Sequence, residues 1–386
     1  MQDLRLGIIG LGNMGQFHAN AIVTGKIAHC HLAAVCDRDE RQLVKYLPAR
    51  GFLLSSELIN SGEVDAVLIA TPHYSHTTIG IEALDSGLHV LIEKPLSVHK
   101  ADGERLLAAH RRPEQVFAAM FNQRTDPYYL KLREMIRRDE LGTIRRINWT
   151  VTHWFRTAVY YASSGWRATW AGEGGGVLLN QSPHQLDLWQ WLFGMPSKVR
   201  AFCQFGHYHD IEVEDDVTAF LEYENGTTGI FITSTGEAPG TERLEVAAES
   251  GRVVIENDRF CWTRNNVAMS KFSKESSDGF AKPEATEIEI PIAGHGGQHH
   301  EMLQNFVDAI LLGKRLIAPA EEGLRSVELA NAMLFSSATD MTVSLPLDAR
   351  AFERWLSGKI KNSSFTRRNV HGSDASLADF SKSFGR

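Results

Sequence analysis

The sequence predicts two domains: an α/β domain built on a parallel sheet, followed by an α+β domain with a mainly antiparallel sheet. The chain has 386 residues, which is long for a single hydrophobic core. Apolar runs alternate with helical stretches over residues 1–123, a pattern typical of βαβ units. Strand-like runs then gather between residues 198 and 291, which favours antiparallel pairing in a separate domain.

We expect the first domain to span residues 1–123. Its strands are rich in Val, Ile, Leu and Ala, as in sheets that helices cover on both faces. The predicted strands are Leu4–Gly10, Leu32–Cys36, Val64–Ala70, Val90–Glu93 and Val116–Phe121. The predicted helices are Gly15–Thr24, Glu40–Arg50, Ser75–Ser86 and Ala101–Arg112.

Residues 124–348 are predicted to form the second domain. Asn225-Gly226 favours a tight hairpin turn, and Gly194 and Pro196 should end a long helix over Gly176–Leu192. The other predicted helices are Pro127–Glu140, His300–Leu312 and Glu322–Met341. The predicted strands are Ile144–Trp154, Val217–Glu224, Thr227–Ser234, Arg243–Ala248, Val253–Asn257 and Thr286–Ile292. Residues 349–386 should form a C-terminal tail or arm, polar and flexible from Ser357 onward.

Composition limits the partners of the protein. The net charge of −7 argues against nucleic-acid binding. No apolar run approaches the roughly 18 residues of a membrane span, and the N-terminal residues lack the layout of a signal peptide. The four cysteines show no metal-ligand spacing. We therefore expect a cytoplasmic protein with reduced thiols, no metal, and neither a membrane nor a nucleic acid as partner.

A glycine-rich turn provides the first functional signal. Gly10-Leu11-Gly12-Asn13-Met14-Gly15 follows an apolar strand and opens a helix, which is typical of Rossmann dinucleotide-binding domains. The glycines allow a tight turn and close approach of pyrophosphate, and the helix N-terminus supplies free N–H groups. Asp37, 22 residues after Gly15, is placed to accept the ribose hydroxyls. Asp37 would repel a 2′-phosphate and so favours NAD, whereas the neighbouring Arg38 could offset that repulsion, so NADP remains possible. The alternative is a Rossmann domain that no longer binds a dinucleotide.

Further motifs resemble those of one oxidoreductase family. They are Ala70-Thr71-Pro72-His73-Tyr74-Ser75-His76, Glu93-Lys94-Pro95, the run from Gly174 to Asp187 (GGGVLLNQSPHQLD) and Trp191-Leu192-Phe193-Gly194. Their order over residues 4–346 is similar to that of the Gfo/Idh/MocA family, which includes inositol and sugar dehydrogenases. The resemblance implies a Rossmann domain, then a large open antiparallel sheet with helices on one face. It also implies hydride exchange between a secondary alcohol and NAD(P).

The resemblance also implies roles for individual residues. Lys94 and His184 are the expected catalytic residues. Beyond the glycine turn, Asp37 and Arg38, the expected cofactor contacts are Thr71, Pro72, His73, His76, Glu93, Lys94, Asn122, Trp166 and Arg167. The expected substrate contacts are Lys94, Arg156, Tyr161, Asn180, His184 and His299. His299 has core packing or helix capping as its alternative role.

Two positions depart from the family pattern. Many members have Asn in place of His73, and many dehydrogenases of the family have Asp in place of Asn180. On the single helix predicted here, Asn180 and His184 would share one face. An asparagine cannot favour a charged imidazole as a carboxylate would. We therefore hypothesise that His184 is neutral and that Lys94, with a pKa lowered by burial, carries more of the proton transfer.

The segment between the predicted domains favours a carbohydrate substrate. It contains His153-Trp154-Phe155-Arg156-Thr157, Tyr160-Tyr161 and Trp166-Arg167-Ala168-Thr169-Trp170. Aromatic faces pack on sugar C–H groups, while Arg, Thr and Tyr bind hydroxyls. A hydrophobic lid or an oligomer contact is the alternative. The His- and acid-rich run Gly206–Asp216 has no metal-ligand spacing and is predicted to be a solvated loop.

Three functions remain open at this point. The leading one is an NAD-dependent dehydrogenase acting on a sugar, sugar derivative or cyclitol. The others are an NAD-recycling enzyme that cleaves glycosides and a non-enzymatic NAD-sensing regulator. The open sheet further predicts a homo-dimer or homo-tetramer, since symmetry covers an exposed sheet face.

Overall fold

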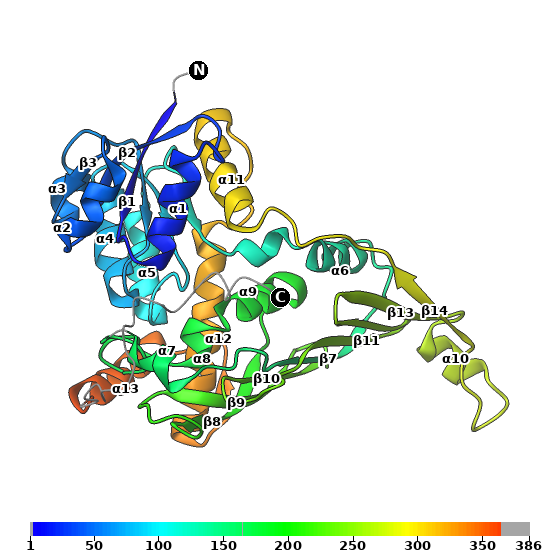
Figure 1. Cartoon of the computed structure of the whole chain (residues 1–386). Helices are drawn as coiled ribbons and strands as arrows, with labels where there is room; N and C mark the ends of the chain where they lie inside the picture. Colours follow the sequence, from blue (N-terminus) through cyan, green and yellow to red (C-terminus); the bar gives the residue numbers. More distant parts are fainter. Residues whose placement is uncertain (1–2, 164, 364–386) are drawn as a thin grey trace.

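The computed structural model describes residues 3–163 and 165–363, and it contains two sheets that form separate layers (Figure 1). The first has six parallel strands and the second has nine strands. Both predicted sheets are therefore confirmed, with the parallel sheet first in the chain.

The first sheet has the order β3-β2-β1-β4-β5-β6, and every neighbouring pair is parallel. Its strands are β1 Leu4–Ile9, β2 Cys30–Cys36, β3 Arg50–Phe52, β4 Ala66–Ile69, β5 His89–Ile92 and β6 Phe117–Ala119. Its helices are α1 Asn13–Val23, α2 Glu40–Leu43, α3 Ser55–Ile59, α4 His73–Asp85 and α5 Lys100–Ala109. The chain order reverses between β1 and β4, and in such sheets ligands bind at the carboxyl ends of the strands there.

One predicted helix of this domain is wrong. Glu40–Arg50 is helical only through α2 and the short 3₁₀ turn η1, Val44–Tyr46. Pro48, which has no N–H to donate to a helix, follows that turn, and Arg50 already begins edge strand β3.

The second sheet has the order β14-β13-β12-β11-β7-β10-β9-β8-β15. Its strands are β7 Ile144–Val151, β8 Lys198–Phe205, β9 Glu214–Glu222, β10 Thr228–Ser234, β11 Glu242–Ala248, β12 Gly251–Glu256, β13 Arg259–Asn265, β14 Ala285–Ile290 and β15 Val343–Ser344. All neighbours are antiparallel except β7 and β10. The predicted Asn225-Gly226 turn joins β9 and β10; Gly226 has a φ of 84° there, which glycine adopts without strain.

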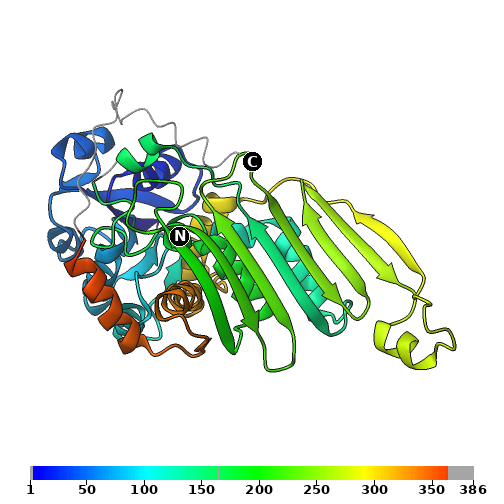
Figure 2. The ribbon, with the colours of Figure 1, turned by 90° about the horizontal axis from the view of Figure 1, so that it is seen from below.

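Helices cover one face of the second sheet and leave the other open. The covering helices include α6 Pro127–Arg137, α8 Val177–Asn180, α9 Pro183–Phe193 and α12 Ala320–Thr339, and they share a hydrophobic core with the strands. Seen from below in Figure 2, the sheet lies in front of these helices with nothing over its near face. Phe202 on β8 and Phe220 on β9 are exposed on the open face.

The two domains are joined by more than one segment. Helix α11, Gln298–Leu312, comes after the second sheet in the chain but packs against the first domain, beside α1 (Figure 1). Its Met302, Leu303 and Phe306 belong to the hydrophobic core of the parallel sheet. Helix α12 contacts α5 of the first domain and α9 of the second. These contacts hold the two sheets in a fixed relation.

The long helix predicted over Gly176–Leu192 is also wrong. It is two helices, α8 and α9, interrupted at Gln181 and Ser182. Pro183 is the first residue of α9 and has no N–H to continue the helix from α8. Asn180 and His184 therefore do not share a helical face.

The remaining elements are short or terminal. They are η2 Asn122–Thr125, α7 Ala158–Ala162, α10 Met269–Glu275 and α13 Ala349–Lys361. The segment expected to be a tail thus begins as a helix, whose Phe352 and Leu356 are buried in the second core. The tail prediction beyond Ser363 falls outside the described residues. Among residues 3–163 and 165–363, no helix has the length and apolar character needed to cross a membrane. All four cysteines are free thiols.

Candidate active site

A cleft of about 970 Å³ lies between the two domains. The carboxyl ends of β1, β2, β4 and β5 form one wall through the segments that follow them. The segment after β7, the junction of α8 and α9, and the residues that lead into α11 form the rest. The cleft therefore joins the expected cofactor side to the expected substrate side.

The glycine turn fits a pyrophosphate. Gly10 has a φ of 93°, and a side chain there would lie 2.7 Å from the carbonyl oxygen of Ala70. A Cβ on Gly15 would lie 1.8 Å from the carbonyl oxygen of Gly10, so α1 can approach the turn only because this residue is glycine. A Cβ on Gly12 would meet no atom within 4 Å and would project into open space. The turn thus leaves room beside the N-terminus of α1, where N–H groups favour an anion.

Asp37 completes this end of the cleft. Its carboxylate accepts the N–H of Leu11 at 2.7 Å and the N–H of Asp39 at 2.9 Å. These bonds fix the carboxylate beside the glycine turn, and each oxygen keeps a further lone pair for a ribose hydroxyl. The residues present therefore fit an adenosine dinucleotide.

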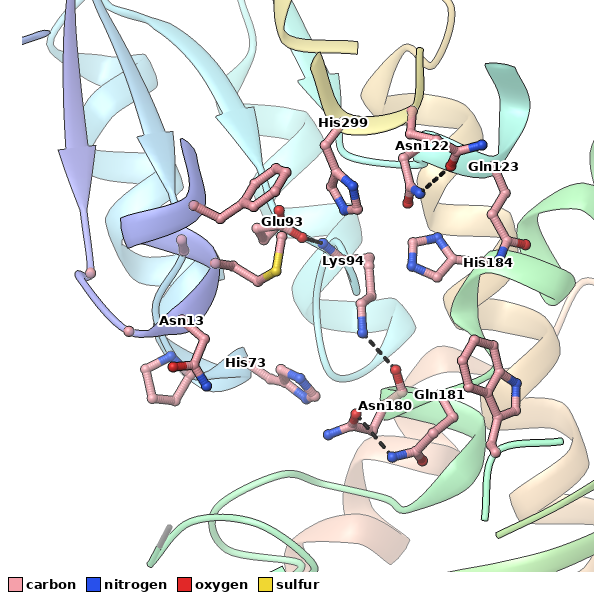
Figure 3. A pocket seen from close by; sticks show the side chains of 18 of the residues that line it. Asn13, His73, Glu93, Lys94, Asn122, Gln123, Asn180, Gln181, His184 and His299 are labelled. Carbon is pink, nitrogen blue, oxygen red and sulfur yellow. Dashed lines mark hydrogen bonds between the residues drawn. The ribbon is translucent and has the colours of Figure 1, made fainter. Parts of the chain in front are cut away.

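Lys94 follows β5 and extends into the centre of the cleft (Figure 3). Its Nζ donates a hydrogen bond of 2.6 Å to the backbone carbonyl of Asn180. Within the described part of the chain, the amine forms no ion pair. Burial lowers the pKa of Lys94 to about 8, an effect that Glu93 partly opposes. The side chain can therefore gain and lose a proton near neutral pH.

Glu93 and His18 form a buried pair beneath Lys94. The His18 ring donates from Nε2 to Glu93 Oε1 at 2.7 Å, and Glu93 Oε2 accepts the backbone N–H of Lys94 at 3.2 Å. Burial would raise the pKa of Glu93, but the hydrogen bond and charge of His18 and the charges of His299 and Lys94 outweigh burial and lower that pKa to about 2. A fixed negative charge therefore lies behind the lysine.

His184, the second residue of α9, faces the cleft opposite the glycine turn (Figure 3). Burial, together with the charge of Lys94, holds the pKa of His184 well below its usual value. Its Nδ1 has no hydrogen-bond partner among the described residues. The ring is thus neutral, and it lines the cleft. Burial likewise lowers the pKa of His299 to about 4.

The aromatic segment forms the wall on the side of the second domain. Trp154, Arg156, Tyr160, Trp166 and Arg167 line the cleft. The Tyr160 hydroxyl accepts a hydrogen bond from the Arg167 guanidinium at 2.7 Å, and that guanidinium also lies over the Trp166 ring. Aromatic faces and hydrogen-bond donors are therefore combined in one wall, as in carbohydrate sites.

Comparison with known proteins assigns both domains to one family. Residues 4–121 match the model described as an oxidoreductase family with an NAD-binding Rossmann fold. Residues 129–254 match that of the GFO/IDH/MocA C-terminal domain. The chain belongs to the Gfo/Idh/MocA family. Its first domain is accordingly the NAD-binding Rossmann domain of a Gfo/Idh/MocA oxidoreductase.

Individual members of the Gfo/Idh/MocA family match nearly the whole chain. Inositol 2-dehydrogenase of Rhizobium meliloti is 24% identical over 358 residues, which span 89% of this chain and 99% of the relative. The crystal structure of the WlbA dehydrogenase from Chromobacterium violaceum, in complex with NADH and UDP-GlcNAcA, is 26% identical and has a TM-score of 0.77, covering 90% of this chain and 97% of that one. Levoglucosan dehydrogenase in complex with NADH and levoglucosan is 20% identical and has a TM-score of 0.72, covering 89% and 100%.

The cleft contains most of the residues expected to contact cofactor or substrate. Those that line it are Gly10, Gly12, Asn13, Met14, Asp37, Thr71, Pro72, His73, Glu93, Lys94, Asn122, Arg156, Trp166, Arg167, Asn180, His184 and His299. Four expected residues do not line it. Gly15 packs beneath the turn, and Arg38 is exposed outside the cleft.

The other two expected residues outside the cleft, His76 and Tyr161, support its walls. His76 is buried, with one ring nitrogen 2.8 Å from the carbonyl oxygen of Thr71 and the other 2.8 Å from that of Pro95. It therefore ties the cofactor loop to the Lys94 loop. The Tyr161 hydroxyl bonds the hydroxyl of Thr235 at 2.9 Å behind the wall.

A segment rich in glycine and histidine also lines the cleft, and of its residues only His299 was expected there. Residues 295–300, which lead into α11, all line the cleft, as do Phe17, Gln123 and Gln181. Gln298 accepts a hydrogen bond from Asn122 at 2.7 Å, which holds this segment against the end of the first domain. The run His295-Gly296-Gly297-Gln298-His299-His300 was a usable signal, because paired glycines mark a loop and binding residues are often carried on loops.

In two acidic clusters of this Gfo/Idh/MocA chain, N–H groups of the protein donate hydrogen bonds to the carboxylates. In the Gly206–Asp216 run, Asp215 accepts the backbone N–H groups of His207, Tyr208 and His209 and the His209 ring. Ligand atoms of His99, Asp102 and Glu353 also lie close together. There the Arg105 guanidinium bonds both carboxylates and supplies the positive charge.

Proposed function

We propose that this chain is an NAD-dependent dehydrogenase that transfers hydride between a secondary alcohol of a sugar, sugar derivative or cyclitol and nicotinamide. One observation carries the proposal. Lys94, a partly buried lysine with a pKa of about 8 and one carbonyl as its hydrogen-bond partner among the described residues, lies in the same cleft as the dinucleotide turn. Such an amine can accept the proton that an alcohol releases when it is oxidised.

The protonation states of the side chains in the cleft suggest a separate role for each. NAD, when bound, supplies the hydride acceptor. Lys94 Nζ takes the hydroxyl proton as a neutral amine and returns it in the opposite direction. His184, held neutral by burial, bonds a substrate hydroxyl and orients the carbon that carries it. Asp37, at the far end of the cleft, favours the unphosphorylated ribose of NAD over that of NADP, since a 2′-phosphate would be repelled.

The substrate class rests on the wall of the second domain and on the relatives. Trp154 and Trp166 offer flat apolar faces, while Arg156 and Arg167 offer donors. This combination suits a ring that carries several hydroxyls. Inositol and levoglucosan appear in the names of two relatives, and both are compact polyhydroxylated rings.

A parallel screen tests the proposal. Purified protein and NAD are incubated with inositols, aldoses and glycosides, and NADH formation and glycosidic bond cleavage are followed together. We expect net NADH from at least one polyol or sugar, and Lys94→Ala should lose that activity while retaining NAD binding. Bond cleavage without net NADH would instead support an enzyme that recycles its cofactor. Near wild-type turnover by Lys94→Ala would refute the role of Lys94.

A further inference from the structure

Glu173 is a buried carboxylate that none of the roles above uses. It lies in the turn before α8 and is only 2% exposed. One carboxylate oxygen accepts the backbone N–H of Ala168 at 2.7 Å, and the other accepts the side-chain amide N–H of Asn180. Within the described residues it forms no ion pair. Burial raises the pKa of this carboxyl, whereas the charge of Arg167 and the hydrogen bonds from Ala168 and Asn180 oppose that rise and favour the ionised form.

Asn180 is held in one orientation. Its Nδ2 donates to Glu173, while its Oδ1 accepts hydrogen bonds of 3.1 Å from the Tyr160 hydroxyl and from Gln181. If the amide nitrogen and oxygen were exchanged, the NH₂ group would face the donors of Tyr160 and Gln181. The amide oxygen would then face the carboxylate of Glu173, which can only accept. The side chain of Asn180 is thus fixed, and with it the last residue of α8.

The backbone of this same residue receives Lys94. Its carbonyl oxygen accepts the Lys94 amine at 2.6 Å, as Figure 3 shows. Hydrogen bonds therefore connect Glu173, Asn180 and Lys94 in series. The charged and titratable groups around the amine are Glu93, Glu173, Arg156, Arg167, His73, His76, His184 and His299.

We propose that Glu173 is a positioning residue for proton transfer: it fixes Asn180, whose carbonyl aims the Lys94 amine, and its buried charge, together with that of Glu93, favours the protonated form of that amine. This inference rests on the proposed role of Lys94. The two carboxylates near the lysine then have separate tasks. Glu93 is held by His18 behind the amine, whereas Glu173 acts from the substrate wall through Asn180.

Exchanging the carboxylate of Glu173 and the amide of Asn180 tests the proposal. Glu173→Gln removes the charge and places an amide N–H against the N–H of Ala168 or of Asn180. Asn180→Asp alone sets two carboxylates against each other. In the double variant Glu173→Gln/Asn180→Asp, the amide at position 173 can donate to the carboxylate at position 180. This restores a hydrogen bond between the two positions, with donor and acceptor exchanged, and returns one negative charge to the wall. Glu214→Gln is the matched control, because Glu214 is also buried and accepts backbone N–H groups near α8.

The readout is the pKa of Lys94 itself. Lysines are reductively methylated with ¹³C and titrated by NMR, and Lys94→Arg identifies the Lys94 signal. From the wild-type value near 8, Glu173→Gln should lower the pKa by about 0.5 or more, since it removes an opposing charge. Asn180→Asp should raise it. The double variant should return it to the wild-type value or above, and Glu214→Gln should leave it in place.

Two results would overturn the proposal. One is an unchanged Lys94 pKa in Glu173→Gln together with a lower melting temperature, which would make Glu173 a purely structural residue. The other is a double variant in which the pKa of Lys94 stays as low as in Glu173→Gln. That result would show that a negative charge at this wall does not act on Lys94. The titration needs no substrate, so it can succeed or fail independently of the dehydrogenase assay.

Discussion

The pH dependence of turnover provides a quantitative test of Lys94. At pH 7 a lysine with a pKa of about 8 is neutral in about one molecule in ten, against about one in three thousand at the ordinary value of 10.5. Burial in the cleft thus raises the fraction of usable base about 300-fold. Because the neutral amine accepts the alcohol proton, oxidation should be slow in acid and reach a plateau above about pH 8.

The assay is kcat/KM for NAD reduction between about pH 6 and about pH 10, with the substrate found by screening. We expect a tenfold rise per pH unit below the pKa of the lysine and a level region above it. The reverse reaction needs the protonated amine and should weaken over the same interval. Lys94→Met should cost about 10²–10⁴-fold, the usual contribution of a general base.

Lys94→Arg is the matched control, because it keeps the positive charge but never deprotonates. It should lose as much turnover as Lys94→Met while both variants still bind NAD. An arginine variant with wild-type turnover and the same rise with pH would refute the reasoning, since the titrating group would then lie elsewhere.

Other predictions concern the cofactor turn, a buried ion pair and assembly. Gly12→Ala should fold normally but bind NAD about tenfold more weakly or worse, because its Cβ projects into the pyrophosphate space. Gly15→Ala should lower the melting temperature instead, and equal effects of the two substitutions in calorimetry would contradict this distinction. Arg124→Met should cost about 3–5 kcal/mol in urea unfolding, because it leaves Asp187 buried without its cation; a loss below about 1 kcal/mol would oppose this account. We also predict a homo-dimer or homo-tetramer built on the open sheet face. Phe202→Asp, at a side chain that is 60% exposed, should then reduce the sedimenting mass, and a monomeric wild type would contradict the prediction.

Local patterns in the sequence predicted the elements that depend on local chemistry. The glycine turn, the Asn225-Gly226 hairpin and the parallel strands each follow from neighbouring residues and are present in the structure. The two wrong helix predictions arise where a single proline interrupts a longer helical pattern. Pro183 divides the predicted long helix, and Pro48 shortens the predicted helix that starts at Glu40.

The candidate site was predictable in its residues but not in its contacts. Lys94 and Asn180 are 86 positions apart, and the sequence gives no reason for the amine to choose the backbone carbonyl over the side chain. Glu173 was missed for the same reason. A glutamate before three glycines is unremarkable in sequence, and its importance follows only from burial beside Asn180.

The position of His184 shows how the site depends on packing far from the cleft. Asp187 lies three residues further along α9, on the same side of the helix. The Arg124 guanidinium bonds it at 2.6 and 2.7 Å and also pairs with Glu322 on α12. Since Arg124 belongs to η2, next to Asn122 and Gln123 in the cleft wall, this one cation ties the end of the first domain to two helices of the second.

We infer that this buried ion network helps to set the distance across the cleft. Loosening Arg124 should therefore displace His184 relative to Lys94 and reduce turnover even where the protein remains folded. A structural role confined to stability would reduce the fraction of folded protein without altering the kcat of the folded molecules. Measuring kcat of Arg124→Lys well below its melting temperature separates the two, because lysine keeps the charge but cannot bond both oxygens of Asp187 in a planar fork.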